Sequence, residues 1–319
     1  MPISLDVTRF IKSFDSKLED IIHEDLPILR DIKKYVIKSG GKRIRPLTHV
    51  FIAQLLGYKG KLWQDVGAIA ELIHSASLLH DDVVDGAELR RGEPTVGKIY
   101  GNKSAILSGD YLLASGIEHL NKLQNPKLMD SFTRVIRDLA VGELLQMEWE
   151  KNPKITSNIY DKIIFGKTAS LFGAVTETAG ILAEVSSIKI KELYTFGVTM
   201  GSLFQKKDDF IDYFESADKS GKVALKDFSN GLYTYPVILL LQKVNKTEQK
   251  EVISLLSKDE KGKTEKDRIL ALMNNYKIQK EFSESLKKDA LFLNTFLAQF
   301  PDTKIRKLMT ERIEGIVKG

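Results

Sequence analysis

Apolar residues recur along most of the chain at the three- and four-residue intervals of an α-helix, and no segment alternates with the two-residue period of a strand. Only 8 prolines interrupt the 319 residues. The pattern predicts an all-α fold, arranged as one bundle of about ten to thirteen helices. The expected helices cover residues 17–38, 43–57, 62–85, 103–122, 126–150, 157–184, 188–215, 233–244, 247–257, 265–275, 277–298 and 302–317.

Glycine and proline mark several of the expected helix ends. Gly40-Gly41 and Gly86 are typical of helix stops, and Pro236 and Pro301 are typical of helix starts. No linker rich in glycine, serine or proline divides the chain, and no solenoid repeat is present. We therefore expect a single domain over residues 1–319.

The composition is that of an ordinary globular protein, with 43% hydrophobic and 29% charged residues. The sequence has no apolar run long enough to span a membrane and no signal-peptide pattern, so we expect a cytoplasmic protein. The lack of cysteine excludes disulfides and thiolate chemistry. The net charge of +5 favours anionic partners, but the basic residues are dispersed, which argues against a nucleic-acid surface.

Two acid clusters with one shared spacing give the strongest indication of chemistry. They occur in the segments LLHDDVVD, at 78–85, and FQKKDDFID, at 204–212. On a helix, carboxylates at positions i, i+1 and i+4 lie close together and repel each other. The six aspartates are Asp81, Asp82, Asp85, Asp208, Asp209 and Asp212.

Such carboxylates suit Mg²⁺, which prefers oxygen ligands and is often held by a few carboxylates together with substrate phosphates. Two clusters could face each other across one cavity and hold a diphosphate through metal ions. The alternative is that each cluster is a solvated helix face. The apolar residues beside each cluster, such as Leu78, Leu79, Phe204 and Phe210, argue against that alternative.

Basic residues surround the first acid cluster. Arg90 and Arg91 follow it, and the segment GGKRIRP, at 40–46, precedes it. Arginine binds phosphate through two N–H groups, and glycine lets the backbone approach an anion closely. Acids and bases in this order indicate a site for a metal and a diphosphate.

These segments together resemble the trans-isoprenyl diphosphate synthases, also called polyprenyl synthetases. The likeness covers nearly the whole chain, and the order of its motifs matches. The matching segments are GGKRIRP at 40–46, LLHDDVVD at 78–85, RRGEPT at 90–95, GELLQ at 142–146, KTASLF at 167–172, FQKKDD at 204–209 and PDTKIR at 301–306. The resemblance implies a helical bundle of the isoprenoid synthase type around a central active-site cavity, and a homodimer.

The resemblance also implies the substrates, isopentenyl diphosphate and an allylic diphosphate, and a magnesium cofactor of three ions. Asp81, Asp85 and Asp208 would be the main Mg²⁺ ligands, with the other three aspartates acting directly or through water. Lys167, Thr168 and Gln205 would lie beside the reacting carbon. The residues that it assigns to substrate binding are Lys42, Arg45, His74, Arg90, Arg91 and Lys222. Of these, Arg90 would contact the allylic diphosphate, and isopentenyl diphosphate would be held by Lys42, Arg45, His74 and Arg91.

Three residues depart from the pattern of the family. Lys206 follows Gln205 where an apolar residue is usual, and helical geometry should point it away from Asp208. Leu225 stands where a glycine is usual, and Leu232 where many members have a lysine that binds diphosphate. Loss of that lysine should weaken substrate binding by about 1–3 kcal/mol without abolishing turnover.

The product should be long, because the growing tail must be buried beneath the first acid cluster. Ala76 and Ser77, about one helical turn before Asp81, are small where short-chain members carry bulky aromatic residues. We therefore expect about seven to nine isoprene units, a length used in quinone side chains, with the product passed to membrane enzymes. Phe132 and Ile136 are candidates for a deeper floor, although ordinary core packing explains them equally well.

Three alternatives remain open from the sequence. A short-chain farnesyl or geranylgeranyl diphosphate synthase would share the motifs but end elongation early. A terpene cyclase would ionise the same kind of substrate, but its second metal motif usually differs from the first. A prenyl-binding partner subunit of a heteromeric synthase would be inactive alone, but such subunits tend to lose the aspartates that this chain keeps.

Overall fold

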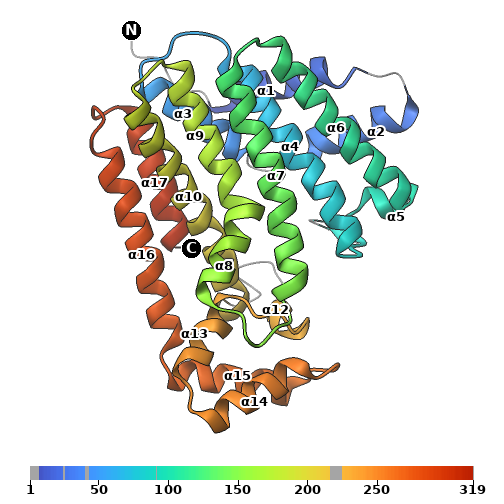
Figure 1. The fold of residues 1–319 in the computed structure, drawn as a ribbon, viewed down its shortest axis with the longest axis vertical. Helices are drawn as coiled ribbons and strands as arrows, with labels where there is room; N and C mark the ends of the chain where they lie inside the picture. The colour runs from blue at the N-terminus through green and yellow to red at the C-terminus, as the bar shows by residue number, and fades with distance from the viewer. Residues whose placement is uncertain (1–6, 24–25, 40–42, 91, 216–224, 319) are drawn as a thin grey trace. The chain divides into compact units, whose positions relative to one another are not determined.

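The computed structural model describes residues 7–23, 26–39, 43–90, 92–215 and 225–318, without the side chains of residues 36, 38 and 39. Nearly all of its secondary structure is helical, which confirms the all-α prediction (Figure 1). The helices of the first half are α1 (Val7–Ile21), α2 (Pro27–Ser39), α3 (Ile44–Leu55), α4 (Trp63–Val84), α5 (Val96–Tyr100), α6 (Asn102–Lys122) and α7 (Pro126–Trp149). Those of the second half are α8 (Ser157–Ile164), the π-helical turn η1 (Phe165–Ala169), α9 (Ser170–Leu182), α10 (Ser187–Phe214), α12 (Lys226–Ser229), α13 (Tyr235–Lys243), α14 (Lys246–Ser257), α15 (Lys263–Asn275), α16 (Ile278–Leu297) and α17 (Lys304–Lys318).

Most predicted helices occur within a few residues of their expected ends, but α5, α12 and the first ten residues of α1 were not predicted. Two expected helices also differ in their structure. The helix expected at 17–38 is instead two helices, since α1 ends at Ile21 and α2 begins at Pro27, whose ring favours the first turn of a helix. The helix expected at 157–184 contains η1, a π turn that apolar spacing does not reveal.

The sequence predicted no strands, but the described residues contain one short antiparallel pair. Strands β1 (Leu89–Arg90) and β2 (Glu93–Pro94) form it, and Gly92 between them has φ of 85°. A positive φ is favourable for glycine, which allows the tight reversal. Two-residue strands are too short to show a recognisable alternation.

The chain forms two compact units. The first comprises residues up to 136 with 171–197 and 300–309, and the second comprises 137–170, 198–299 and 310–319. In the first unit, α4 packs along α6 (Figure 1) and also against α3 and α1. Leu72 and Ala76 of α4 join Ala105 and Leu112 of α6 in a fully buried apolar cluster. This packing holds the C-terminal end of α4, which carries the first acid motif.

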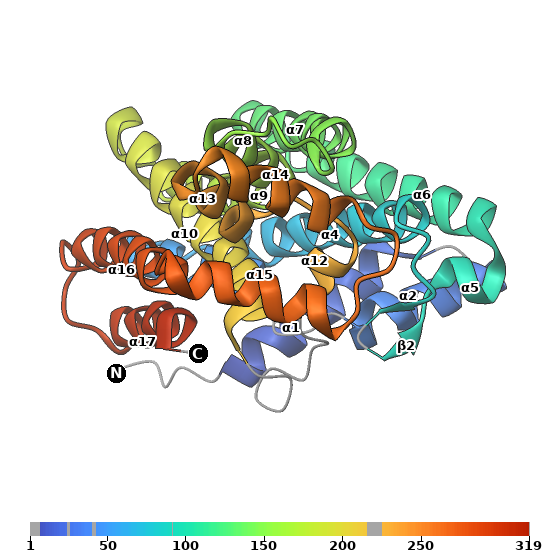
Figure 2. The same cartoon turned by 90° about the horizontal axis from the view of Figure 1, so that it is seen from below.

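In the second unit, α16 packs against α13 and α15, and α14 lies beside α15 (Figure 2). Phe282 of α16 forms an aromatic contact with Phe210 of α10, with ring centroids 5.5 Å apart. Its ring centroid is also 4.8 Å from that of Tyr235 at the start of α13. These contacts fix the part of α10 that carries the second acid motif.

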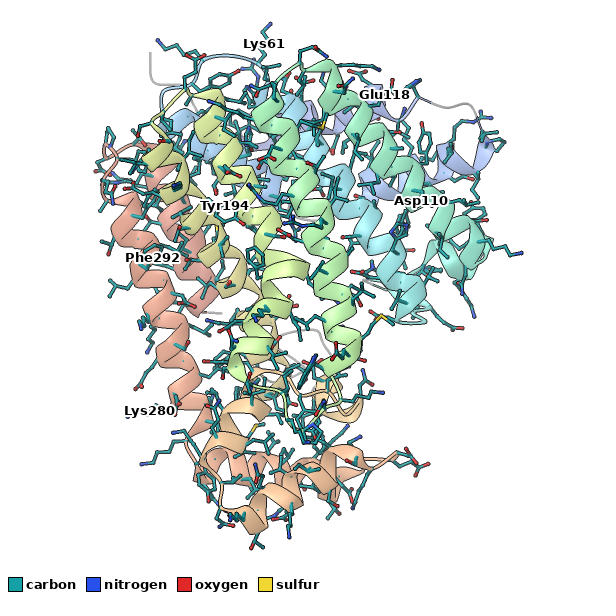
Figure 3. The ribbon with its side chains drawn as sticks, in the orientation of Figure 1. Lys61, Asp110, Glu118, Tyr194, Lys280 and Phe292 are labelled. Atoms are coloured by element: carbon teal, nitrogen blue, oxygen red, sulfur yellow. The ribbon has the colours of Figure 1, made fainter. Side chains whose placement is uncertain are left out.

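The outer face of α16 is exposed, and Lys280 and Phe292 project from it (Figure 3). Its inner residues, including Leu286 and Leu293, are buried. The helix is therefore amphipathic, as the 3.6-residue spacing of its apolar residues predicts. Among the described residues, no helix has both the length and the apolar content that a membrane span requires.

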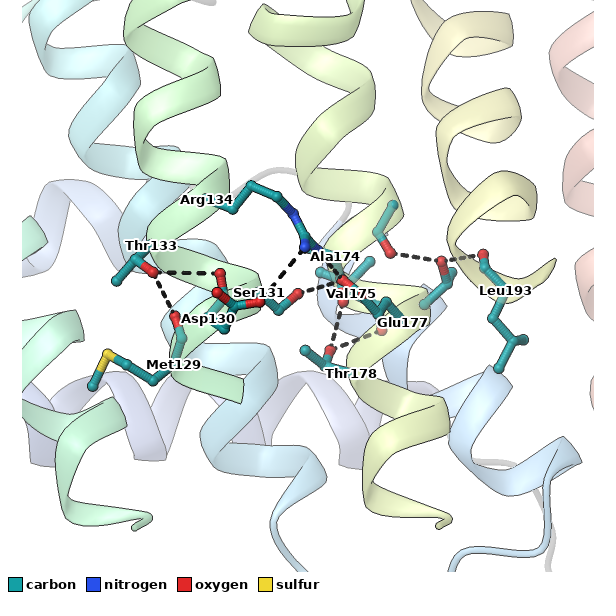
Figure 4. A network of polar contacts seen from close by, with 12 residues as sticks. Met129, Asp130, Ser131, Thr133, Arg134, Ala174, Val175, Glu177, Thr178 and Leu193 are labelled. Atoms are coloured by element: carbon teal, nitrogen blue, oxygen red, sulfur yellow. Dashed lines mark hydrogen bonds and ion pairs between the residues drawn. The ribbon is translucent and has the colours of Figure 1, made fainter. Parts of the chain in front are cut away.

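Polar contacts join helices within the first unit (Figure 4). Ser131 and Arg134 of α7 both contact Glu177 Oε2 of α9, at 2.6 and 2.5 Å. His49 of α3 is fully buried, and its Nδ1 lies 2.7 Å from the Val175 carbonyl oxygen. Burial lowers the pKa of His49 to about 4, so its ring is neutral at physiological pH.

Candidate active site

The first acid motif lies at the C-terminal end of α4. Asp81 and Asp82 are in its last turn, and Asp85 is the residue that follows the helix. Asp82 is buried and Asp85 is exposed. The C-terminal end of a helix carries partial negative charge, so three carboxylates there are unfavourable unless cations or N–H groups offset them.

Arg90 supplies part of that compensation. The guanidinium Nε and Nη2 both lie 2.8 Å from Asp82 Oδ1, because β1 and β2 return the chain toward the end of α4. Burial lowers the pKa of Arg90, but the hydrogen bond and charge of Asp82 outweigh this effect and the pKa is raised. The other oxygen, Oδ2, is buried and accepts no hydrogen bond within the described part of the chain. A buried carboxylate oxygen without a donor fits a metal ligand or a bound water.

The other residues expected near the first motif occupy varied positions. Arg45 of α3 lies over the ring of Phe172, with its guanidinium carbon 4.9 Å from the ring centroid. His74 is half-buried on α4, and its carbonyl oxygen accepts a hydrogen bond from Ser77 Oγ at 2.9 Å. The predicted contacts Lys42, Arg91 and Lys222 lie outside the described residues.

The second acid motif lies in the last two turns of α10, where Asp208 is exposed and Asp209 is buried. Asp209 accepts hydrogen bonds from the Tyr160 hydroxyl at 2.7 Å and the Gln205 amide nitrogen at 3.2 Å. Burial raises the pKa of Asp209 to about 6, although these hydrogen bonds oppose the shift and nearby Asp208 adds to it. The buried carboxylate is therefore held in one orientation but is electrostatically destabilised.

Asp212, the third member of this motif, accepts hydrogen bonds from the backbone N–H groups of Lys226 and Asp227, at 2.9 and 3.0 Å. Burial raises the pKa of Asp227 to about 7, with further contributions from Asp209 and Asp212. A group of carboxylates with raised pKa values is stabilised in its charged form by a nearby cation. The donor set of this unit therefore fits a divalent metal ion.

Neither motif forms a closed metal cage by itself. Among the described residues, no three histidine, aspartate or glutamate side chains converge closely enough to hold an ion. Mg²⁺ is commonly held by a few carboxylates, with water and substrate phosphates completing its coordination.

The residues expected to lie beside the reacting carbon are connected in the second unit. Thr168 Oγ1 donates to Gln205 Oε1 at 3.1 Å, and Gln205 donates in turn to Asp209. Lys167, also in the π turn η1, pairs with Glu143 Oε2 of α7 at 2.5 Å. The structure thus links Thr168 and Gln205 to the second acid motif through one chain of hydrogen bonds.

Sequence reasoning missed two residues of this site. Glu143 lies in the segment GELLQ, which carried the family resemblance without an assigned role. Tyr160 has no motif around it, and only its hydrogen bond to Asp209 identifies it. A pattern of spacing along one helix cannot reveal a partner that comes from another helix.

Two departures from the family pattern have structural consequences. Lys206 Nζ lies 3.0 Å from Asp289 of α16 and 5.7 Å from the ring centroid of Tyr235, so it contributes to packing. Leu225 has φ of 58°, the left-handed conformation, and its side chain is buried. Its N–H donates to the Asp212 carbonyl oxygen at 2.9 Å. The position where glycine is usual therefore has a backbone conformation that favours glycine.

Comparison with known proteins identifies the family. The sequence profile of the polyprenyl synthetases matches residues 26–273. The chain belongs to the polyprenyl synthetase family. It is 32% identical over 253 residues to the octaprenyl diphosphate synthase of Escherichia coli K12, covering 79% of this chain and 78% of that protein. It is therefore a polyprenyl diphosphate synthase, an enzyme that transfers prenyl groups.

Solved structures of other polyprenyl synthetases share the fold. The crystal structure of a decaprenyl diphosphate synthase from Rhodobacter capsulatus superposes with a TM-score of 0.91 at 29% identity, over 98% of this chain and 96% of that one. A polyprenyl synthase from Caulobacter crescentus, solved with calcium and isoprenyl diphosphate, gives 0.88 at 30% identity, over 98% and 95% of the two chains. The fold is that of the isoprenoid synthases.

The left-handed conformation of Leu225 predicts an unusual order of stability between two variants. Leu225→Ala and Leu225→Gly both lose the buried side chain, but only glycine relieves the backbone strain. We expect the glycine variant to be more stable than the alanine variant by about 1 kcal/mol, measured by urea unfolding. At exposed Ala140 within α7, replacement by glycine should instead lower stability by about 1 kcal/mol. If glycine were less stable than alanine at position 225 as well as at position 140, the left-handed conformation assigned to Leu225 would be contradicted.

Proposed function

We propose that this enzyme joins isopentenyl diphosphate to an allylic diphosphate, such as farnesyl or geranylgeranyl diphosphate, and repeats the reaction to make a long all-trans polyprenyl diphosphate. The observation that carries the proposal is the chain of contacts from Thr168 through Gln205 to Asp209, in a chain that keeps both acid motifs. The octaprenyl and decaprenyl synthases among its relatives support a long product.

We propose that Asp81, Asp85 and Asp208 are the main Mg²⁺ ligands. The buried and anchored members of the two motifs, Asp82, Asp209 and Asp212, act directly or through water. Asp85 and Asp208 are exposed, as carboxylates that share a metal with water and substrate need to be. Bound Mg²⁺ supplies Lewis acidity, which draws negative charge onto the departing diphosphate. The calcium and isoprenyl diphosphate in the Caulobacter relative support a divalent metal and this substrate class.

The protein groups have three tasks in this reaction. Basic side chains orient the two diphosphates, and Arg90 and Lys167 are the described candidates for the allylic one. The sequence offers further candidates for binding the substrate diphosphates, namely Lys42, Arg45, His74, Arg91 and Lys222. When the allylic C–O bond breaks, the oxygens of Thr168 and Gln205 stabilise the carbocation as fixed dipoles. The double bond of isopentenyl diphosphate then attacks the cation, and the released pyrophosphate takes the proton that is lost.

We also propose that the two compact units act as a single polyprenyl synthetase domain. The family match at residues 26–273 includes parts of both units, which supports this assignment. Each unit contributes one acid motif, so neither carries the full set of proposed ligands. Use of the product as a quinone side chain, after transfer to membrane enzymes, follows from the proposed length.

Purified protein with farnesyl diphosphate, isopentenyl diphosphate and Mg²⁺ tests the proposed reaction. We expect polyprenyl diphosphates, detected by mass, and loss of product when EDTA removes the metal. Asp81→Asn and Asp208→Asn should each lower kcat by about a hundredfold or more, because each removes a charged metal ligand. Asp267→Asn, at an exposed site on α15, is the matched control and should retain activity.

Two outcomes of this assay would contradict the proposal. An inert pure chain would indicate a partner subunit that needs a second protein. A cyclic hydrocarbon released from the allylic diphosphate alone would indicate a terpene cyclase.

Product length tests the proposed role of Ala76, which is only 2% exposed within the apolar cluster of the first unit. Ala76→Phe should shorten the product to about three or four isoprene units, because a bulky ring occupies space that the tail would fill. Ala76→Leu should give intermediate lengths, while Ser77→Ala, which adds no bulk, should leave the distribution unchanged. If the folded Ala76→Phe variant makes products of full length, Ala76 does not control chain length. If the unaltered enzyme makes short products, a short-chain synthase is favoured.

We propose that the enzyme is a homodimer that associates through α5 and the start of α6. Ile99, Ile106 and Leu107 are exposed there by 54%, 42% and 67%, and adjacent large apolar side chains are typical of an interface. Asp110 and Glu118, which follow these residues on α6, are labelled in Figure 3.

Sedimentation of the purified protein tests this interface. The unaltered protein should have twice the 36.0 kDa mass of one chain. Leu107→Glu should shift it toward the monomer, because a buried unpaired charge is unfavourable at an interface. Asn121→Glu, which adds the same charge at an exposed position farther along α6, should remain dimeric. A Leu107→Glu variant that remains dimeric would exclude this surface.

A further inference from the structure

The ion pair between Lys167 and Glu143 lies close to the proposed reaction centre. Lys167 Nζ is 2.5 Å from Glu143 Oε2, and the two side chains are 22% and 16% exposed. Lys167 neighbours Thr168, which donates to Gln205 at 3.1 Å. The pair therefore belongs to the same part of the second unit as the second acid motif.

The backbone sets the position of this pair. A Cβ atom on Gly142 would lie 2.7 Å from Gly166 Cα, and one on Gly166 would lie 2.5 Å from Gly142 Cα, so only glycine allows this approach of α7 to η1. Glu143 and Lys167 are the residues that directly follow these two glycines. Direct contact between the two backbones thus brings the opposite charges together with little dependence on side-chain flexibility.

The hydrogen-bonding capacity of the pair is not saturated. A lysine ammonium has three N–H donors. For Lys167, the described residues offer one acceptor group, Glu143. Both carboxylate oxygens of Glu143 are buried, and neither accepts a hydrogen bond of good geometry from them, although Lys167 Nζ lies 2.5 Å from Oε2. An ammonium with donors left over can bind a phosphate oxygen while it remains beside its carboxylate.

We propose that Glu143 is a positioning residue that directs the Lys167 ammonium toward the allylic diphosphate and weakens its hold on that anion. This inference rests on the proposed function, in which Lys167 binds the diphosphate. The negative charge of Glu143 opposes the binding of another anion at the same ammonium. Because each elongation cycle releases one pyrophosphate, a weaker hold allows the next cycle to begin.

Glu143→Gln keeps the size of the side chain and removes its charge. We expect the Ki of inorganic pyrophosphate and the KM of the allylic diphosphate to fall about three- to tenfold. This is the effect expected when one partly screened negative charge no longer repels the bound anion. Steady-state kcat should fall as well, because pyrophosphate leaves more slowly. Glu148→Gln, the same change at an exposed position of α7, should alter none of these constants.

A double-mutant cycle with Lys167→Ala tests whether Glu143 acts through Lys167. In the Lys167→Ala background, Glu143→Gln should change the Ki of pyrophosphate by less than about twofold. An equal change in both backgrounds, or a rise in Ki with Glu143→Gln alone, would overturn the inference. Glu143→Asp keeps the charge, so its Ki for pyrophosphate should lie within about twofold of that of the unaltered enzyme. Thermal unfolding checks that each variant is folded.

These experiments separate the inference from the proposed function. An unaltered enzyme that makes no polyprenyl diphosphate contradicts the function itself. An active enzyme whose Ki for pyrophosphate is unaffected by Glu143→Gln contradicts only the role of Glu143.

Discussion

The constraint on which each acid motif depends is the crowding of carboxylates at the end of its helix. Asp81, Asp82 and Asp85 lie where the dipole of α4 is already unfavourable for negative charge, and the second triplet lies in the corresponding part of α10. Burial adds to the effect, as the raised pKa of Asp209, about 6, indicates. Local stability does not explain such an arrangement, whereas a divalent metal would stabilise every one of these charges.

Within each triplet, the surrounding structure anchors at least one buried carboxylate and leaves another exposed. Arg90 holds Asp82, and Tyr160 and Gln205 hold Asp209, while Asp85 and Asp208 face solvent. The spacing of i, i+1 and i+4 allows this division, because adjacent residues on a helix point in directions about 100° apart. A buried carboxylate that is fixed by its neighbours can orient the motif, and exposed ones can exchange water for metal or substrate.

The sequence predicted the parts of this molecule that depend on local pattern. Helical periodicity located most of the helices to within a few residues, and the repeated acid motif predicted a metal-binding role for its aspartates. The π turn at Phe165–Ala169 was not predictable, because the backbone contact of Gly142 with Gly166 accompanies it and these residues are far apart in sequence. Glu143 and Tyr160 were missed for the same reason. Leu225 was recognised as unusual, but only its φ of 58° explains why glycine is common there.

The hydrogen bonds around Gln205 connect the second acid motif to the two side-chain oxygens that we propose for stabilising the carbocation. Because its amide nitrogen donates to Asp209, the amide oxygen must point the other way, toward Thr168. Thr168 uses its only hydroxyl proton on that oxygen, so its own oxygen can offer only lone pairs to its surroundings. Both oxygens thereby present negative potential, which suits a carbocation. Because the Asp209 carboxylate accepts from the Gln205 amide, it fixes the orientation of these dipoles in addition to its proposed role in metal binding.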